Sequence, residues 1–268
     1  KGENWERGPY YLDGLIPLAW QLEDEELQNL ARRFVDWILA SQDEEGFFGP
    51  KDNPDWWPRM VALKILQQYY MATGDERVID FMTRYFRYQS ETLPSKPLGH
   101  WTFWGAERGG DNLLVVYWLY DITGDESLLA LGDLIHTQSS DWTGRFTTDN
   151  HLYRQNSLHC VNLAQGFKEP VVYYQSSKLD EHLNAPIEAL RRIRHTIGFP
   201  TGLWAGDELI HFGEPTRGSE LCTAVEMMYS LEEMAEIDRL RRSDPEAART
   251  KTRDLLKKLE TEQPADNP

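Results

Sequence analysis

Residues 202–222 carry a dense set of side chains that can take part in acid–base or metal chemistry. Besides one of the two cysteines of the chain, the segment holds four groups that could face one ligand: Glu208, His211, Glu214 and Glu220. Glycine and proline interrupt the segment, so a loop is favoured over a helix. Glycoside hydrolysis needs one carboxyl group that protonates the leaving oxygen and a second that stays ionised. The pattern predicts a loop-borne catalytic site, with a solvated acidic loop as the simpler alternative.

Six short runs follow one another along the chain. They are WERGPYYLDGLIPLA (5–19), WWPRM (56–60), RGGDN (108–112), HCVNLAQG (159–166), GDE (206–208) and SELCT (219–223). In this order they resemble the β-L-arabinofuranosidase family of glycoside hydrolases, glycoside hydrolase family 127, and the resemblance covers residues 5–235. It implies an (α/α)6-barrel catalytic domain, a glutamate as general acid/base and a zinc-held cysteine as nucleophile.

The resemblance also implies roles for individual residues. Glu208 matches the acid/base, and Glu220 and Cys222 match the Glu-x-Cys half of the metal site, which makes all three catalytic candidates and the last two zinc ligands. Family members carry a later Cys-Cys pair whose first member is the nucleophile, and no cysteine follows Cys222 in this sequence. Structural zinc sites use four ligands, so we expect weak zinc binding. His211 or Glu214 could complete a ligand set, but their spacing is not diagnostic.

The loops that enter the apolar helices combine aromatic and hydrogen-bonding side chains. A sugar stacks its C–H faces on aromatic rings, while its hydroxyl groups need both donors and acceptors. By its H-x-V-N context His159 matches an active-site histidine of the family. We therefore expect these loops to bind a carbohydrate substrate through Arg7, Asp13, Trp57, Arg59, Arg108, Asp111, Asn112, His159 and Asn162. Structural alternatives are that the tryptophans seal the inner helices and that Asp111 and Asn112 cap a helix.

Helical hairpins recur about every fifty residues. The runs YMATGDERVI (70–79) and YDITGDESLL (120–129) each follow an apolar helix and begin an amphipathic one. Their glycine predicts a left-handed helix end, and their aspartate favours the start of the next helix. Such hairpins bury their faces only by stacking on neighbours, so we predict an all-α toroid of the (α/α)6-barrel type. Five hairpins are countable, one short of a six-pair barrel.

The composition changes near residue 238. We expect residues 1–237 to form one (α/α)-barrel catalytic-type domain, because barrels often reach this length as a single domain. Residues 238–268 are charged and unlike the family, and they predict one amphipathic helix over 245–260 and a disordered tail. We interpret the chain as a fragment or a barrel with an altered C-terminus, which an export signal could once have preceded.

The charge balance excludes two classes of partner. Lysine and arginine number 28 against 44 acidic residues, a net charge of −16, which repels nucleic acid and anionic membrane surfaces. No apolar run reaches 18 residues, so we expect a soluble protein, whether cytoplasmic, periplasmic or extracellular. The two cysteines, Cys160 and Cys222, are too few for a disulfide framework, and we expect both to be reduced.

The resemblance implies a glycoside hydrolase-like protein that acts on a plant-type glycan. We expect Glu208 to share one funnel with Arg108, Asp111 and His159, since all four come from loops that enter inner helices. One alternative is a sugar epimerase or isomerase on the same architecture, which would act on free reducing sugars. A second alternative is a non-catalytic carbohydrate-binding fragment.

Overall fold

The computed structural model describes residues 5–148, 158–211 and 214–243. Within these ranges the regular structure is helical, and the extended backbone forms only isolated bridges. The described residues fall into two compact units, the first made of 5–105 and 114–134 and the second of 106–113 and 135–243. The helix expected over 245–260 and the tail to residue 268 lie outside the described residues.

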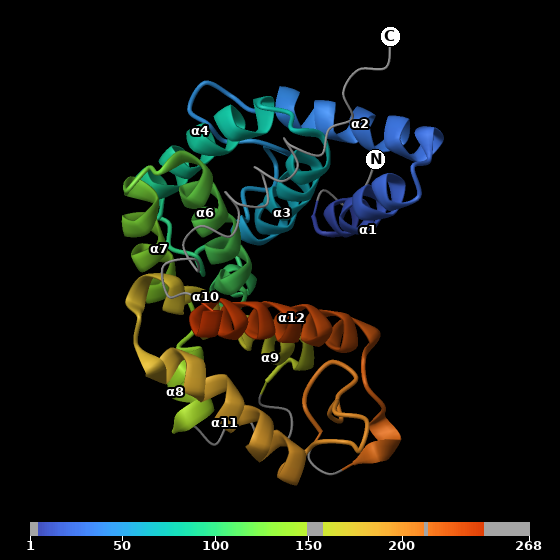
Figure 1. The fold of residues 1–268 in the computed structure, drawn as a ribbon, viewed down its shortest axis with the longest axis vertical. Helices are drawn as coiled ribbons and strands as arrows, with labels where there is room; N and C mark the ends of the chain where they lie inside the picture. The colour runs from blue at the N-terminus through green and yellow to red at the C-terminus, as the bar shows by residue number, and fades with distance from the viewer. Residues whose placement is uncertain (1–4, 149–157, 212–213, 244–268) are drawn as a thin grey trace. The chain divides into compact units, whose positions relative to one another are not determined.

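The first unit is built from helical hairpins (Figure 1). Helix α1 (Arg7–Gln21) packs against α2 (Glu25–Ala40) and α3 (Trp56–Thr73), and α4 (Arg77–Thr92) packs against α2 and α3. The Asp24 side chain caps α2 by accepting a hydrogen bond from the Leu27 N–H. Gly74, at φ 68°, ends α3, and this left-handed end confirms the prediction from the Thr-Gly-Asp run.

Burial separates the two kinds of helix that the sequence predicts. Helix α3 is buried almost all round, from Trp56 to Tyr70. Helix α2 buries only a narrow stripe of Ala31, Val35 and Ile38, and its other side chains are half-buried or exposed. This contrast between apolar and amphipathic partners is what a stacked hairpin requires.

Two further helices cross the boundary between the units. They are α6 (Gly109–Thr123) and α7 (Ser127–Gln138), joined through a second Thr-Gly-Asp run. Gly124, at φ 69°, supplies the left-handed end of α6, as the sequence predicts. The short helix α5 (Trp104–Glu107) precedes them.

The second unit packs its helices around one aromatic core. Its helices are α8 (Trp142–Thr147), α9 (Cys160–Gly166), α10 (Lys168–Ser177), α11 (Asp180–Thr196) and α12 (Leu221–Ser243). Helix α9 packs against α10 and α12, while α10 and α8 pack against α11 (Figure 1). The core between them contains Trp142, Phe146, Phe167 and Trp204, all fully buried.

No helix in the described ranges combines the length and apolar character needed to cross a bilayer.

Between α11 and α12 the chain forms an irregular loop with one short 3-10 turn, η2 (Pro215–Arg217). This loop, drawn in orange in Figure 1, contains the acidic segment that the sequence singles out.

Candidate active site

Main-chain hydrogen bonds hold the acidic loop against the start of α9. The Cys160 N–H donates to the Glu208 carbonyl oxygen at 2.9 Å, and the Ile210 N–H donates to the Leu158 carbonyl oxygen at 2.9 Å. His159 and Leu209 therefore face each other in an antiparallel bridge. Because the backbone fixes this register, Glu208 cannot move far from His159 without breaking two hydrogen bonds.

Gly206 ties the loop to the start of α12. Its N–H donates to the Gly218 carbonyl oxygen at 3.0 Å, and its own carbonyl accepts from the Glu220 N–H at 2.9 Å. A Cβ atom on Gly206 would lie 2.8 Å from the Cβ of Cys160, closer than side-chain atoms approach one another. Because Gly206 has no side chain, the segments around Cys160 and Glu220 can both pack against the backbone of Gly206.

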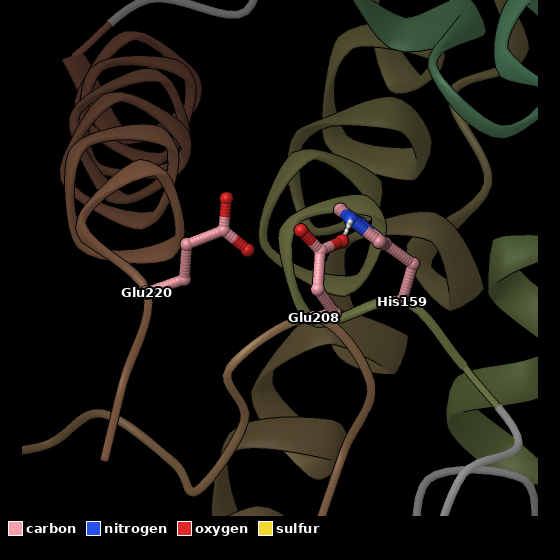
Figure 2. A group of neighbouring side chains, drawn as sticks. All are labelled: His159, Glu208 and Glu220. Carbon is pink, nitrogen blue, oxygen red and sulfur yellow. Dashed lines mark hydrogen bonds and ion pairs between the residues drawn. The ribbon is translucent and has the colours of Figure 1, made fainter. Parts of the chain in front are cut away.

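His159 contacts Glu208 directly. The Nε2 atom of His159 lies 3.2 Å from Oε2 of Glu208, and Figure 2 shows the two side chains meeting. The Nδ1 atom of His159 accepts a hydrogen bond from the Asn162 N–H at 3.3 Å, so His159 also caps α9. Since Nδ1 is an acceptor, the neutral ring carries its proton on Nε2 and donates it to the carboxylate.

Electrostatics favours this neutral form of His159. Burial is the main cause that lowers the pKa of His159, and the positive charge of Arg108 lowers it further. The carboxylates of Glu220 and Glu208 oppose this fall without reversing it. His159 is thus an uncharged donor at neutral pH. The Glu208 side chain, by contrast, is 76% exposed and accessible to a substrate.

Glu220 brings a second carboxylate to the same place. Figure 2 shows Glu220, just before α12, directing its carboxylate toward His159 and Glu208. One ligand atom of each of these three residues lies within 4.8 Å of the other two, and theirs is the group of possible metal ligands found in the described part of the chain. Of the four loop side chains expected to face one ligand, Glu208 and Glu220 are therefore neighbours.

Both cysteines adjoin Glu220. The Sγ atom of Cys160 lies 3.4 Å from Oε2 of Glu220, and Cys160 is fully buried. Burial raises the pKa of the Cys160 thiol to about 12, an effect that the nearby Thr223 hydroxyl opposes and the Glu220 charge strengthens. Partial burial, followed by the charge and hydrogen bonding of Glu220, also raises the pKa of Cys222. Both thiols are free, as the sequence predicts.

Behind this group lies a layer of buried polar side chains. The Arg108 Nε donates to Oδ1 of Asn162 at 2.9 Å, one turn of helix from His159. Asp111 forms an ion pair with Lys168 at 3.1 Å. Asn112 is fully buried beside them on α6. The structure thus places Arg108, Asp111, Asn112 and Asn162 in one unit with Glu208 and His159, as supports under the loops rather than on an open surface.

Four of the expected sugar-binding residues belong to the first unit. Arg7 is exposed at the start of α1. Asp13 pairs with Lys64 at 2.8 Å. Trp57 is buried, and its Nε1 donates to Glu6 at 2.6 Å. Their roles in substrate binding remain predictions.

Arg59 has a clear structural role in the first unit. Its guanidinium donates to the carbonyl oxygens of Phe48, Asp55 and Pro50 at 3.0, 2.7 and 3.2 Å. Arg59 is 3% exposed, and burial lowers its pKa. Three carbonyl acceptors compensate for the burial of this charged group, so its contacts organise the loop before α3.

His211 and Glu214, the other candidates on the loop, lie apart from this group. The His211 Nε2 pairs with Asp207 at 2.7 Å and also lies 3.2 Å from an Arg217 nitrogen. The hydrogen bond from His211 is the main cause that lowers the pKa of Asp207. Glu214 is exposed and interacts with Thr216. Neither residue belongs to the group of possible metal ligands that the described part of the chain forms around Glu220.

Sequence reasoning missed the proximity of Cys160 to the acidic loop. Its apolar surroundings indicated only a reduced core cysteine, and the structure confirms that it is free and buried. Its neighbour in sequence, His159, was a candidate, and that adjacency was the available signal. The contact with Glu220 spans 60 positions and depends on how α9 packs against α12.

The fold and the candidate site define a class: this is an all-α protein of helical hairpins in which an acidic loop meets a histidine at the start of a helix. The chain belongs to the family described as "Beta-L-arabinofuranosidase, GH127 catalytic domain", which matches residues 7–248. No curated protein matches the chain.

A solved structure named "Glycoside hydrolase" has a similar fold. The TM-score is 0.65 at 13% sequence identity, and the likeness covers 85% of this chain and 42% of that chain. This chain therefore spans less than half the length of that structure's chain. Together with the helical hairpins, the likeness confirms the predicted all-α fold of the (α/α)-barrel type.

Proposed function

We propose that the chain provides the acid/base and metal-binding part of a glycoside hydrolase that releases β-L-arabinofuranosyl groups from a plant-type glycan. The contact between His159 and Glu208 carries this proposal, because it places an oriented, exposed carboxyl group on the acidic loop. Membership of the family supports the reaction class, and the name of the family supports the sugar.

Glu208 is the general acid/base in this proposal. Its exposed carboxyl group gives a proton to the glycosidic oxygen as the bond to the sugar breaks. The carboxylate that results then takes a proton from the water molecule that completes hydrolysis. His159 donates from Nε2 to Oε2 of Glu208, which leaves Oε1 free to exchange the proton with the substrate. His159 is therefore a positioning residue.

Zinc fits the donor atoms beside Glu208. Carboxylate and thiolate groups are common zinc ligands, and Glu220 and Cys222 stand at the start of α12, whose N-terminus favours negative charge. Zinc, when bound, would hold a cysteine as the thiolate, the nucleophilic form of the side chain. The sequence holds no counterpart of the family's nucleophile, so in this proposal the water molecule that Glu208 activates attacks the sugar directly, and the chain supplies the acid/base, zinc-binding and sugar-binding roles.

The buried polar layer supports the sugar-binding loops. Arg108 and Asn162 form a hydrogen bond beneath His159, and Asp111 is held by Lys168. Side chains locked in this way keep loop residues in one geometry, which a site that recognises hydroxyl groups needs. We propose that they fix the floor of the site, while the exposed loop residues face the sugar.

Three assays on the unaltered chain distinguish the proposal from its alternatives. The first follows the release of nitrophenol from aryl β-L-arabinofuranosides and the matched α-anomers. Another detects isomers formed from free L-arabinose, and the third measures the binding of these sugars by calorimetry. Release from the β-anomers alone is expected. Isomers of the free sugar would instead indicate an epimerase or isomerase, and binding without either reaction a non-catalytic carbohydrate-binding protein.

A further inference from the structure

A buried carboxylate of the second unit pairs with a histidine that the candidate active site does not use. Nδ1 of His136, in the last turn of α7, lies 2.7 Å from Oε1 of Glu169 on α10. The Glu169 side chain is 1% exposed, and its Oε2 atom has no hydrogen-bond partner in the described part of the chain. Burial raises the pKa of Glu169, which the hydrogen bond and the charge of His136 oppose. An ionised Glu169 therefore depends on His136.

A second histidine packs against this pair. The ring of His136 stacks on that of Tyr173, with 3.6 Å between the centroids and 7° between the planes. His182 meets both rings at a steep angle, with its centroid 5.5 Å from that of His136 and 5.1 Å from that of Tyr173. The three rings come from α7, α10 and α11, so their cluster joins three helices of one unit.

The turn from α10 to α11 is connected to the same cluster. Oγ of Ser177 accepts a hydrogen bond from the Leu179 N–H at 3.3 Å and lies 2.6 Å from Nδ1 of His182. The serine hydroxyl can then donate its proton to Nδ1, which favours the neutral His182 ring with its own proton on Nε2. Between Ser177 and Leu179, Lys178 has a φ of 55°, a left-handed conformation that is unfavourable for a residue with a side chain. The contacts of Ser177 hold this turn in place.

Several charges act on His182. Burial is the largest cause that lowers the pKa of His182, and the charge of His136 is the second. The titratable groups around the cluster are His136 from α7, Asp141 at the start of α8, Glu169 and Tyr173 from α10, and Glu181 from α11. Asp141 and Glu181 favour a charged His182, but both are exposed and do not reverse the fall of its pKa.

We propose that the contact between Ser177 and His182 is a pH switch, in which proton binding by His182 breaks the contact and frees the first turns of α11 from α7 and α10. The switch is a property of the second unit that goes beyond the proposed function and does not rest on it. Helix α11 leads into the acidic loop, so the switch lies on the element that precedes the candidate active site.

Protonation changes two interactions of His182. A proton from solvent binds Nδ1, so this nitrogen becomes a donor and the Ser177 hydroxyl can no longer donate to it. The positive charge also lies beside His136, and the two rings then have one buried carboxylate, Glu169, between them. Because the folded pKa of His182 is lowered, the unfolded turn binds the proton first as the pH falls through about 6.5. The stability of the turn should therefore decrease below that pH.

Hydrogen exchange at pH 7.5 and 5.5 tests the switch on the unaltered chain. After correction for the pH dependence of intrinsic exchange, the amides of residues 184–188 should lose protection at pH 5.5 and regain it at pH 7.5. His182→Gln cannot bind the proton and should show no such loss. The matched control is His195→Gln, which alters an exposed histidine of the same helix and should keep the response. Unchanged protection in the unaltered chain, or the same loss in a folded His182→Gln chain, would overturn the proposal.

Histidine NMR gives a second readout, which tests the coupling of the two rings. His136→Gln should raise the pKa of His182 toward 6.5, because it removes the neighbouring charge. His195→Gln should leave that pKa unchanged. An equal pKa of His182 with and without His136 would show that the rings are not coupled and would also overturn the proposal. Neither readout uses hydrolysis, so failure of the glycosidase assays would reject the proposed function and leave the switch standing. Hydrolysis beside pH-independent protection would do the reverse.

Discussion

His159 uses its two ring nitrogens for different partners: Nε2 lies 3.2 Å from Glu208 Oε2, and Nδ1 accepts the Asn162 N–H at 3.3 Å. The hydrogen bond to Nδ1 leaves Nε2 as the donor of the neutral ring. One histidine thereby joins the start of α9 to the carboxyl group of the acidic loop. The protonation state of His159 should consequently influence both the stability of the chain and the behaviour of Glu208.

The pKa of His159 should be lower than 6.5, the ordinary pKa of a histidine side chain, so its titration should have its midpoint below pH 6.5. Arg108→Gln should raise that pKa toward 6.5, because the charge of Arg108 is the second cause of the shift after burial. Arg108→Lys keeps the charge and should leave the midpoint nearer that of the unaltered chain. Histidine NMR across pH 4.5–8 measures all three. A midpoint above 6.5 in the unaltered chain would show that the ring is held as a cation.

The same shift makes stability depend on pH. Since the folded pKa of His159 is lowered, the unfolded chain binds the proton first as the pH falls through about 6.5. The free energy of unfolding should therefore decrease below that pH, until the folded state also binds the proton. His159→Gln should make this decrease shallower between pH 7 and 5 in urea unfolding. An equally steep decrease in the variant would show that His159 does not cause this pH dependence of stability.

Lys168 should be among the residues most important for the stability of the second unit. Its side chain is fully buried and pairs with Asp111 at 3.1 Å and Glu226 at 3.4 Å. Lys168→Met removes the positive charge that both buried carboxylates face, which should cost about 3–5 kcal/mol in the free energy of unfolding. The control is Arg191→Ala, whose side chain is 73% exposed and which should change stability by less than about 0.5 kcal/mol. Denaturant unfolding compares the two, and equal effects would contradict this prediction.

Gly206→Ala should destabilise the acidic loop. The new Cβ would lie 2.8 Å from the Cβ of Cys160 and 3.1 Å from the Leu209 carbonyl oxygen, so the backbone must shift at a cost of about 1–3 kcal/mol. Gly14→Ala in α1 meets no atom within 4 Å and should instead stabilise the chain by about 0.5–1 kcal/mol. Thermal unfolding of the two variants should move in opposite directions. A Gly206→Ala chain as stable as the unaltered one would contradict this prediction, because it would show that the loop backbone can shift to admit the new Cβ without a cost in stability.

Local patterns were enough to predict the helices. The Thr-Gly-Asp runs give the left-handed ends at Gly74 and Gly124 because glycine alone adopts that conformation without strain. The apolar and amphipathic helices also follow from side-chain periodicity, which depends on residues only three or four positions apart. The all-α fold is therefore accessible from the sequence.

The candidate site was accessible only in part. The motif order identified Glu208, Glu220 and His159, since each occurs in a short recognisable run. The contact of Cys160 with Glu220 could not be predicted, because it depends on the packing of two helices and on the missing Cβ of Gly206. The buried ion pair of Asp111 with Lys168 could not be predicted either, because it also depends on how distant parts of the chain pack. A lysine in an apolar run does not reveal which carboxylate it meets.

The most direct test of the central claim is the dependence of Glu208→Gln on the leaving group. Turnover of aryl β-L-arabinofuranosides should fall about 10²–10⁴-fold for poor leaving groups and much less for nitrophenol, which needs little protonation. Glu214→Gln, an exposed control on the same loop, should retain the rates of the unaltered chain for the whole series. A Glu208→Gln chain that hydrolyses alkyl and nitrophenyl arabinofuranosides with unchanged rates would contradict the assignment of Glu208 as the general acid/base.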